Sequence, residues 1–267
     1  MATRTSDEID YELIGDDLQA VIVKLDPGET VIAEAGAMMF MAQGIEMNTT
    51  LDPNKQGSGI MGKLFQGAKR VLSGDTFFIT TFANSGRGRK RVAFSSPFPG
   101  KIKPIDLQQW GGTVIAQKDS FLCAPKGTNV DIAFTKRIGA GFFGGEGFIL
   151  QRISGDGVAV LHASGAIWET TLMAGETLRV DTGCIVAMEQ QVQYDIKLVP
   201  GIKTALFGGE GLFFATLRGP GRVWMQSLPL SRLAGRIVAA APKTGRGGRE
   251  EGSLLGGLGR MLDGDNS

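Results

Sequence analysis

The feature that most constrains the fold of this chain is a glycine-rich segment that occurs twice. Phe143-Gly-Gly-Glu-Gly-Phe-Ile-Leu150 returns 64 positions later as Phe207-Gly-Gly-Glu-Gly-Leu-Phe-Phe214. The same shift aligns Gly155–Val160 with Gly219–Trp224, so the two copies match without a gap. Self-similarity of this kind predicts that one supersecondary unit is used more than once.

Weaker copies extend the pattern to three units. Gly74–Ile79 is a third version of the glycine-rich segment. A second motif joins Pro27–Val31 to Ala174–Leu178 and, more weakly, to Pro99–Ile102. In chain order the two motifs alternate, beginning with the second and ending with the first. The chain therefore starts and finishes with half a unit.

These half-units suggest how the fold could close. If the three units form a closed arrangement, Gly209–Leu230 completes its unit with Leu18–Met41. Strands near 18–25 and 222–228 would then belong to one module. Closure would pair the edge strands that the half-units otherwise leave open at both ends.

Apolar runs of strand length, separated by glycine-bearing turns, predict an all-β fold. The 40 glycines occur mostly as Gly-X-Gly and Pro-Gly pairs and indicate turns rather than low complexity. Val130–Phe134 and Val192–Leu198 alternate as half-buried strands do, whereas Ala37–Met41 is apolar throughout and is expected to be buried between layers. Further strands are expected near 18–25, 74–82, 92–94, 105–108, 113–117, 120–124, 158–161, 166–171, 177–180 and 184–188.

The domain organisation follows from these runs. A chain of 267 residues can bury a sizeable core, and we assign 10–235 to one all-β domain of three repeats. Residues 236–267 are expected to be a flexible, glycine-rich C-terminal tail, because Thr244–Ser253 has the composition of a linker.

One short segment near 60–72 has the pattern of an amphipathic helix. Its apolar residues recur at helical spacing, with Lys63, Lys69 and Arg70 on the other face. A basic amphipathic helix can dock on a membrane surface or on a partner. A helix packed on the sheet with a solvated basic face explains the same pattern.

Two groups of charged residues are candidate interaction sites. Arg87, Arg89, Lys90 and Arg91 place four basic residues in five positions, which could bind phosphate or nucleic acid, although a charged hairpin tip explains them as well. A second set occupies equivalent places in the three repeats and could form a carboxylate ring for a cation or for acid–base work. Hydrogen bonds that fix the neighbouring glycine turns are the simpler role for this set, which is Asp75, Glu146 and Glu210.

The sequence lacks the residues that most enzyme chemistry requires. His162 is the only histidine, so a metal site of the cupin kind, with several histidines and a carboxylate, is excluded. Cys123 and Cys184 sit in apolar runs and are expected to be buried free thiols rather than a disulfide or zinc ligands. A nucleophile elbow and a phosphate loop are also missing. We expect no catalytic residues, no metal and no cofactor.

Charge and hydropathy bear on partners and compartment. The formal net charge of +1 indicates neither a nucleic-acid tract nor a strongly acidic face. The polar N-terminus has no secretory core, and no run of about eighteen apolar residues exists. The expected location is cytoplasmic.

Several motifs resemble those of a known family. Gly209–Phe213, Gly219–Ser227 and Arg70–Phe78 are similar to hallmarks of the altered-inheritance-of-mitochondria protein 24 family, a mitochondrial biogenesis family with many bacterial members. The resemblance implies three repeats of a short double-stranded β-helix or β-sandwich type, related to the tryptophan RNA-binding attenuation protein and often oligomeric. It supplies no catalytic residues.

Two functions are compatible with these observations. The first is a non-enzymatic scaffold, a homo-oligomer that binds protein or, through 60–72, a membrane surface. The alternative is a nucleic-acid-binding module, suggested by fold analogy and by the basic residues 87–91; fold analogy is a weak argument for function. An enzyme that uses the glutamates at 146 and 210 ranks third.

Overall fold

The protein is built almost entirely of antiparallel β-sheet, which confirms the predicted all-β class. The computed structural model describes residues 5–34, 36–50, 79–136, 148–198 and 213–240. The helix expected near 60–72 lies outside these residues. The short 3-10 turns are η1 (Leu107–Trp110), η2 (Lys118–Ser120) and η4 (Thr182–Cys184).

Four sheets, here named A to D, contain the strands of the described residues. Sheet A has the strand order β1 (Asp10–Ile14), β2 (Ala20–Leu25), β7 (Lys90–Ser95), β4 (Met38–Met41). Sheet B has the order β5 (Ile45–Thr50), β6 (Ile79–Asn84), β3 (Thr30–Glu34), β10 (Phe121–Pro125), β13 (Val158–Ser164), β8 (Gly100–Asp106). Sheet C has the order β11 (Asn129–Lys136), β12 (Phe148–Ser154), β9 (Thr113–Gln117), β16 (Ile185–Glu189), β19 (Gly221–Gln226), β14 (Ile167–Leu172). Sheet D has the order β15 (Thr177–Asp181), β18 (Phe213–Arg218), β17 (Gln193–Leu198).

The sheets are stacked, and a hydrophobic core lies between each successive pair. In β3, Val31 and Ala33 belong to the first core, between sheets A and B, while Ile32 belongs to the second, between B and C. In sheet C, Val114 faces the second core and Ile115 faces the third, between C and D. The central strands of sheets B and C are therefore buried on both faces, which explains why they are continuous apolar runs.

Sheets B and C also share details of strand pairing. Each joins two groups of three strands, through the pairing of β3 with β10 in sheet B and of β9 with β16 in sheet C. A β-bulge interrupts β10 between Phe121 and Cys123 and β16 between Ile185 and Ala187. In sheet A, β4 carries a bulge between Met38 and Phe40 where it pairs with β7. Strands β4, β10 and β16 therefore each carry a bulge, which fixes the register of the strand.

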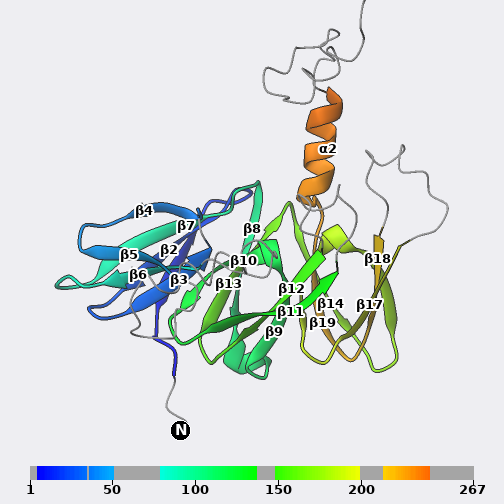
Figure 1. Cartoon of the computed structure of the whole chain (residues 1–267), viewed down its shortest axis with the longest axis horizontal. Coiled ribbons are helices and arrows are strands. Elements are labelled where there is room, and N and C mark those ends of the chain that lie inside the picture. The colour runs from blue at the N-terminus through cyan, green and yellow to red at the C-terminus, as the bar shows by residue number, and fades with distance from the viewer. Residues whose placement is uncertain (1–4, 35, 51–78, 137–147, 199–212, 241–267) are drawn as a thin grey trace, which may run out of the picture.

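The predicted closure of the chain on itself is wrong. The strand near 18–25 is β2 in sheet A, whereas the strand near 222–228 is β19 in sheet C. Figure 1 shows β4 and β7 at one end of the long axis and β17 and β18 at the other. In sheets B and C, the second group of three strands comes from a later stretch of the chain than the first group. The described strands at the two ends of the stack, in sheets A and D, therefore do not pair with each other. The weak motif copy at Pro99–Ile102 is also misplaced, because it leads into β8 while Gly111-Gly112 forms the turn before β9.

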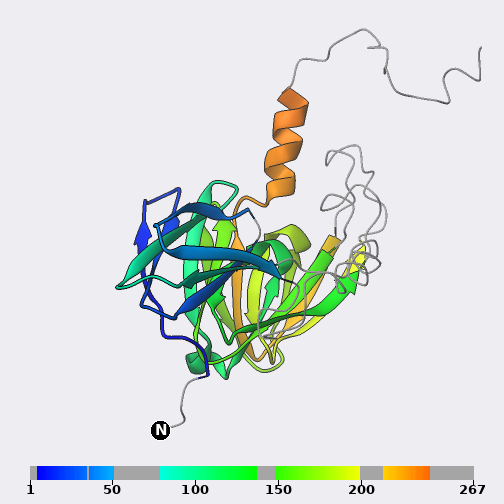
Figure 2. The ribbon, with the colours of Figure 1, turned by 60° about the vertical axis from the view of Figure 1, so that its left-hand side comes forward.

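Helix α2 (Leu230–Ala240) was not predicted, and the expected tail boundary at 236 falls inside it. Leu230, Leu233 and Ile237 recur at helical spacing directly after Pro229, but Gly235 interrupts the pattern in the sequence. Figures 1 and 2 show α2 projecting away from the sheets. Within the described residues, no helix is both long enough and apolar enough to cross a membrane.

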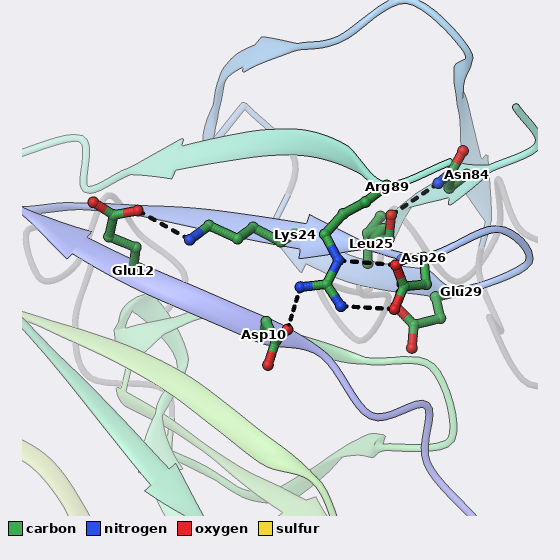
Figure 3. A network of polar contacts seen from close by, with 8 residues as sticks. All are labelled: Asp10, Glu12, Lys24, Leu25, Asp26, Glu29, Asn84 and Arg89. Carbon is green, nitrogen blue, oxygen red and sulfur yellow. Dashed lines mark hydrogen bonds and ion pairs between the residues drawn. The ribbon is translucent and has the colours of Figure 1, made fainter. Parts of the chain in front are cut away.

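A buried amide anchors the turn between β6 and β7. Asn84 is 1% exposed, and its Nδ2 donates to the carbonyl oxygens of Leu25 at 2.8 Å and Gly88 at 3.0 Å. Its Oδ1 accepts from the Gly86 amide at 3.0 Å. Figure 3 shows the bond from Asn84 to Leu25. The three hydrogen bonds hold the end of β2 and the turn together.

Replacing this amide should destabilise the fold. Asn84→Ala removes three hydrogen bonds from a buried position, and we expect the free energy of unfolding to fall by about 2–4 kcal/mol. Urea denaturation followed by circular dichroism measures the change. Asn48→Ala, at an exposed position of β5, is the control and should alter stability by less than about 0.5 kcal/mol. Equal stability of both variants would contradict the anchoring role.

Candidate interaction surface

The most unusual surface of the protein is strand β4, which consists of large apolar side chains. Met38, Met39, Phe40 and Met41 are 37%, 51%, 36% and 41% exposed. The sequence predicted that this run is buried between layers, and that prediction is wrong. The physical reason is position, because β4 is the last strand of sheet A and no described strand pairs with its outer edge.

The strands most like β4 in pairing are buried. Strand β10 lies between β3 and β13, and β16 lies between β9 and β19. All residues of β10 are buried, as are all but the last residue of β16. Burial of such a strand therefore depends on a neighbour along its second edge.

Strand β15, at one edge of sheet D, is another edge strand. It pairs with β18 but, among the described strands, has no partner on its other side, whereas β3 and β9 each pair with strands on both sides. An edge strand presents unpaired backbone N–H and C=O groups, which can bind another strand. Exposed methionines adapt their shape to a partner surface, so β4 adds apolar contact to this capacity.

Among the basic residues at the β6–β7 turn, Arg89 is held by carboxylates. Arg89 donates to both carboxylate oxygens of Asp26 at 2.8 Å and to Asp10 at 2.6 Å, as Figure 3 shows. The hydrogen bond from Arg89 lowers the pKa of Asp26 and raises that of Arg89 itself. Lys24 pairs with Glu12 at 3.2 Å beside them.

This network sets what the basic cluster can do. Its two cations face three carboxylates, and all five side chains are exposed by about a third or more. Exposed ion pairs add little stability. They do occupy three of the N–H donors of Arg89, so a phosphate would compete with two carboxylates for this guanidinium. Arg87 lies exposed in the turn, and Lys90 and Arg91 begin β7.

Most of the other predicted site residues lie outside the described residues. This applies to the three basic residues of the segment 60–72 and to the three carboxylates of the repeats, which are Lys63, Lys69, Arg70, Asp75, Glu146 and Glu210. Their roles remain predictions.

His162 lies beside a serine, Ser96, but has no described carboxylate beside its ring. Its Nδ1 lies 3.0 Å from Oγ of Ser96, and its ring contacts Phe98 at a centroid distance of 4.8 Å. Burial lowers the pKa of His162 to about 4, so the ring is neutral at pH 7. Its Nε2 is buried without a described hydrogen-bond partner, so no described carboxylate orients the imidazole as a general base requires.

The two cysteines are the remaining nucleophile candidates. Cys123 is free and buried, as expected, whereas Cys184 is free but only half-buried. Burial raises the pKa of both thiols, so neither is a thiolate near neutral pH. No group of three or more metal-ligating side chains occurs within the described residues.

One titratable residue was missed by the sequence reasoning. Glu34 ends β3 and lines a cleft of about 470 Å³ that also contacts Asp119 and the start of α2. Burial, followed by the charge of Asp119, raises the pKa of Glu34 to about 7. A carboxyl that titrates near pH 7 can move protons. The described lining of the cleft, however, contains no histidine, cysteine or lysine to work with it.

The raised pKa of Glu34 makes stability depend on pH. The folded protein keeps a proton that the unfolded chain releases above its ordinary pKa of 4.5, so this contribution is full below pH 4.5 and is lost as pH rises through about 7. We expect the melting temperature to fall between pH 5 and pH 8. In Glu34→Gln the corresponding loss of unfolding free energy should be smaller by an amount on the order of 2 kcal/mol. Calorimetry across this range tests it. Glu46→Gln, on the exposed face of β5, should leave the decline unchanged, and an identical profile for the Glu34 variant would contradict the assignment.

Comparisons with known proteins agree with the fold. The chain is 31% identical over 224 residues to an uncharacterised protein of Streptococcus pyogenes serotype M6, a match that covers 83% of this chain and 86% of the relative. An X-ray crystal structure of a Streptococcus pyogenes protein superposes with a TM-score of 0.69 at 24% identity, covering 88% of this chain and all of the other. The family model for mitochondrial biogenesis AIM24 matches residues 11–228. The chain therefore belongs to the mitochondrial biogenesis AIM24 family.

Proposed function

We propose that this protein is a non-enzymatic scaffold that forms a homo-oligomer and binds proteins through its open sheet edges. The observation that carries the proposal is β4, a strand of three methionines and one phenylalanine that is exposed along its whole length. Exposed contiguous apolar surface on a soluble domain marks an interaction site. Addition of a strand to an open edge supplies backbone hydrogen bonds, and the apolar side chains supply burial.

The clefts favour this function over an enzyme. The cleft at Glu34 contains two acids, Glu34, whose pKa is raised to about 7, and Asp119. A second cleft, of about 480 Å³, is lined largely by apolar groups and includes Met39 of β4. The described lining of neither cleft contains a histidine, cysteine or lysine.

The proposal includes three finer features. The first is that the chain consists of three units in series, which the shared strand order of sheets B and C supports. The second is kinship with the fold of the tryptophan RNA-binding attenuation protein. The third is a cytoplasmic location. Contact of 60–72 with a membrane surface rests on the sequence pattern alone.

Nucleic-acid binding is the less favoured alternative. It was motivated by the cluster 87–91 and needs cations that are free to meet phosphates. The two carboxylates that hold Arg89 count against it. The net charge of +1 also offers little long-range attraction for a polyanion.

Light scattering on the full chain tests the scaffold. We expect a defined mass that is a multiple of 28.3 kDa. Phe40→Lys places a charge on the apolar edge, where burial is costly, and should shift the mass toward that of one chain. Met47→Lys changes a side chain on β5 that is 49% exposed and serves as the matched control. A single-chain mass for the unaltered protein at all concentrations would contradict the proposal.

The same measurement separates the possible ligands. Anionic liposomes that capture the oligomer would place the membrane face among its functions. A shift with a random RNA pool that disappears at high salt would instead favour the nucleic-acid alternative. With neither shift, a protein partner remains the expected ligand.

A further inference from the structure

The first two cores are each completed by strands from the following stretch of chain. The first core lies between sheets A and B, and its members from β8, β10 and β13 are Ile102, Leu122, Cys123 and Val160. The second core is completed in the same way by β14, β16 and β19, which contribute Ile167, Val186, Ala187 and Trp224. These are the second groups of three strands in sheets B and C.

The third core lacks such a contribution. It is closed on one side by sheet D, which has only the three strands β17, β18 and β15. By comparison with sheets B and C, the missing group would pair with the open edge of β15. Among the described strands, one group of three has the arrangement of these second groups but has no first group paired along its edge. It is β4, β7 and β2, in the order that corresponds to β10, β13 and β8.

Trp168 marks the surface that this missing group would cover. Trp168 pairs with Met225 across β14 and β19, and Met225 belongs to the third core, so the two side chains share the face toward that core. The residue in the same position of sheet A is Val21, which pairs with Phe94 across β2 and β7. Val21 is 0% exposed in the completed first core, whereas Trp168 is 58% exposed. The difference reflects the absence of covering strands over the third core.

We propose that β15 of one copy of this chain pairs antiparallel with β4 of a second copy. Sheet D of the first copy and sheet A of the second then form one continuous sheet. This inference rests on the proposed scaffold function and identifies its primary partner as another copy of the same chain. The occupant is a second copy because both halves of the incomplete sheet are present in every chain, at opposite ends of the stack (Figure 1).

The register of the new pair follows from the two pairings already present. Cys123 of β10 lies opposite Ala33 of β3, one residue after the bulge. Ala187 of β16 lies opposite Ala116 of β9 at the same distance from its bulge. Phe40 of β4 also follows its bulge directly.

On the edge of β15, the matching position is counted from the first residue of the strand. Ala33 and Ala116 are both the fourth residue of their strands, and Val180 is the fourth residue of β15. Phe40 of one copy should therefore lie opposite Val180 of the other, and Met41 opposite Arg179. Val180 belongs to the third core, so this register directs Phe40 onto that core.

The contact is heterologous, since a different edge is used on each copy. Every added copy presents a fresh β4 or β15 edge, so the assembly forms a ring where the rotation between copies closes and a filament where it does not. The buried surface includes the exposed apolar side chains of β4 and Trp168. Removing these groups from water supplies the driving force for association.

Disulfide trapping tests the register. Met41→Cys and Arg179→Cys, both at exposed positions, are combined in one full-length chain that also carries Cys184→Ser. Directly opposed residues of antiparallel strands have the Cα separation that a disulfide needs. After oxidation with copper phenanthroline in air, we expect a ladder of masses in multiples of 28.3 kDa on a non-reducing gel. Met39→Cys with Arg179→Cys is the control. Residue 39 lies in the bulge and is two positions away from 41, so it is not opposite 179 in this register and should give severalfold less ladder.

A charge exchange at the same pair provides a second measurement. Met41→Lys places a cation opposite Arg179 and should raise the concentration needed for half-assembly by tenfold or more, since opposed like charges destabilise a strand pair. Adding Arg179→Glu to that variant should restore assembly. Circular dichroism confirms that each variant is folded.

The outcomes separate this inference from the scaffold function. An oligomer that shows no 41–179 ladder and no response to the charge exchange would overturn the strand pairing and leave the scaffold standing. Equal ladders from the 41–179 and 39–179 pairs would also overturn it. A single-chain mass at all concentrations would overturn both. A specific ladder together with charge rescue supports the pairing.

Discussion

The architecture depends on the lateral pairing of two strands that belong to successive stretches of the chain, β3 with β10 and β9 with β16. The central strands of sheets B and C are buried on both faces, so their backbone groups have no access to water from above or below. Their N–H and C=O groups must therefore be satisfied along the plane of the sheet. The pairing of β3 with β10 and of β9 with β16 provides these hydrogen bonds, and it also connects each core to the next. Loss of either pair would expose two open edges in the middle of the molecule.

The all-β class was predictable because its signals are local. Glycine turns and apolar runs of five or six residues specify strands wherever they occur, and β9 and β10 lie where they were expected. The assignment of strands to sheets was not predictable, since it depends on pairings between distant residues. The run Ala37–Met41 shows the limit most clearly. Its composition is that of a buried strand, but within one chain β4 is an edge strand of sheet A and is exposed. Helix α2 was missed for the opposite reason, a local one, because Gly235 breaks its pattern.

The candidate sites were predicted with similar limits. The basic run 87–91 is evident in the sequence, but the carboxylates that hold Arg89 come from β1 and from the turn after β2, more than sixty positions away in the chain. Glu34 carries no sequence signal at all. Its altered acidity results from burial in a cleft between β3, η2 and the start of α2, and such burial exists only in the folded molecule. The unpaired edge of β15 likewise has no signature in its residues.

Strand β1 has a consequence for the shape that any assembly can take. It covers the far edge of sheet A, and all but the last of its five residues are exposed, including Asp10 and Glu12. Charged side chains on an exposed edge strand oppose the approach of another sheet. One side of sheet A is thus protected by acids, while the other presents apolar side chains. In the proposed assembly, sheet A would therefore join another copy through β4 alone, without the branched aggregation that two adhesive edges on one sheet would promote.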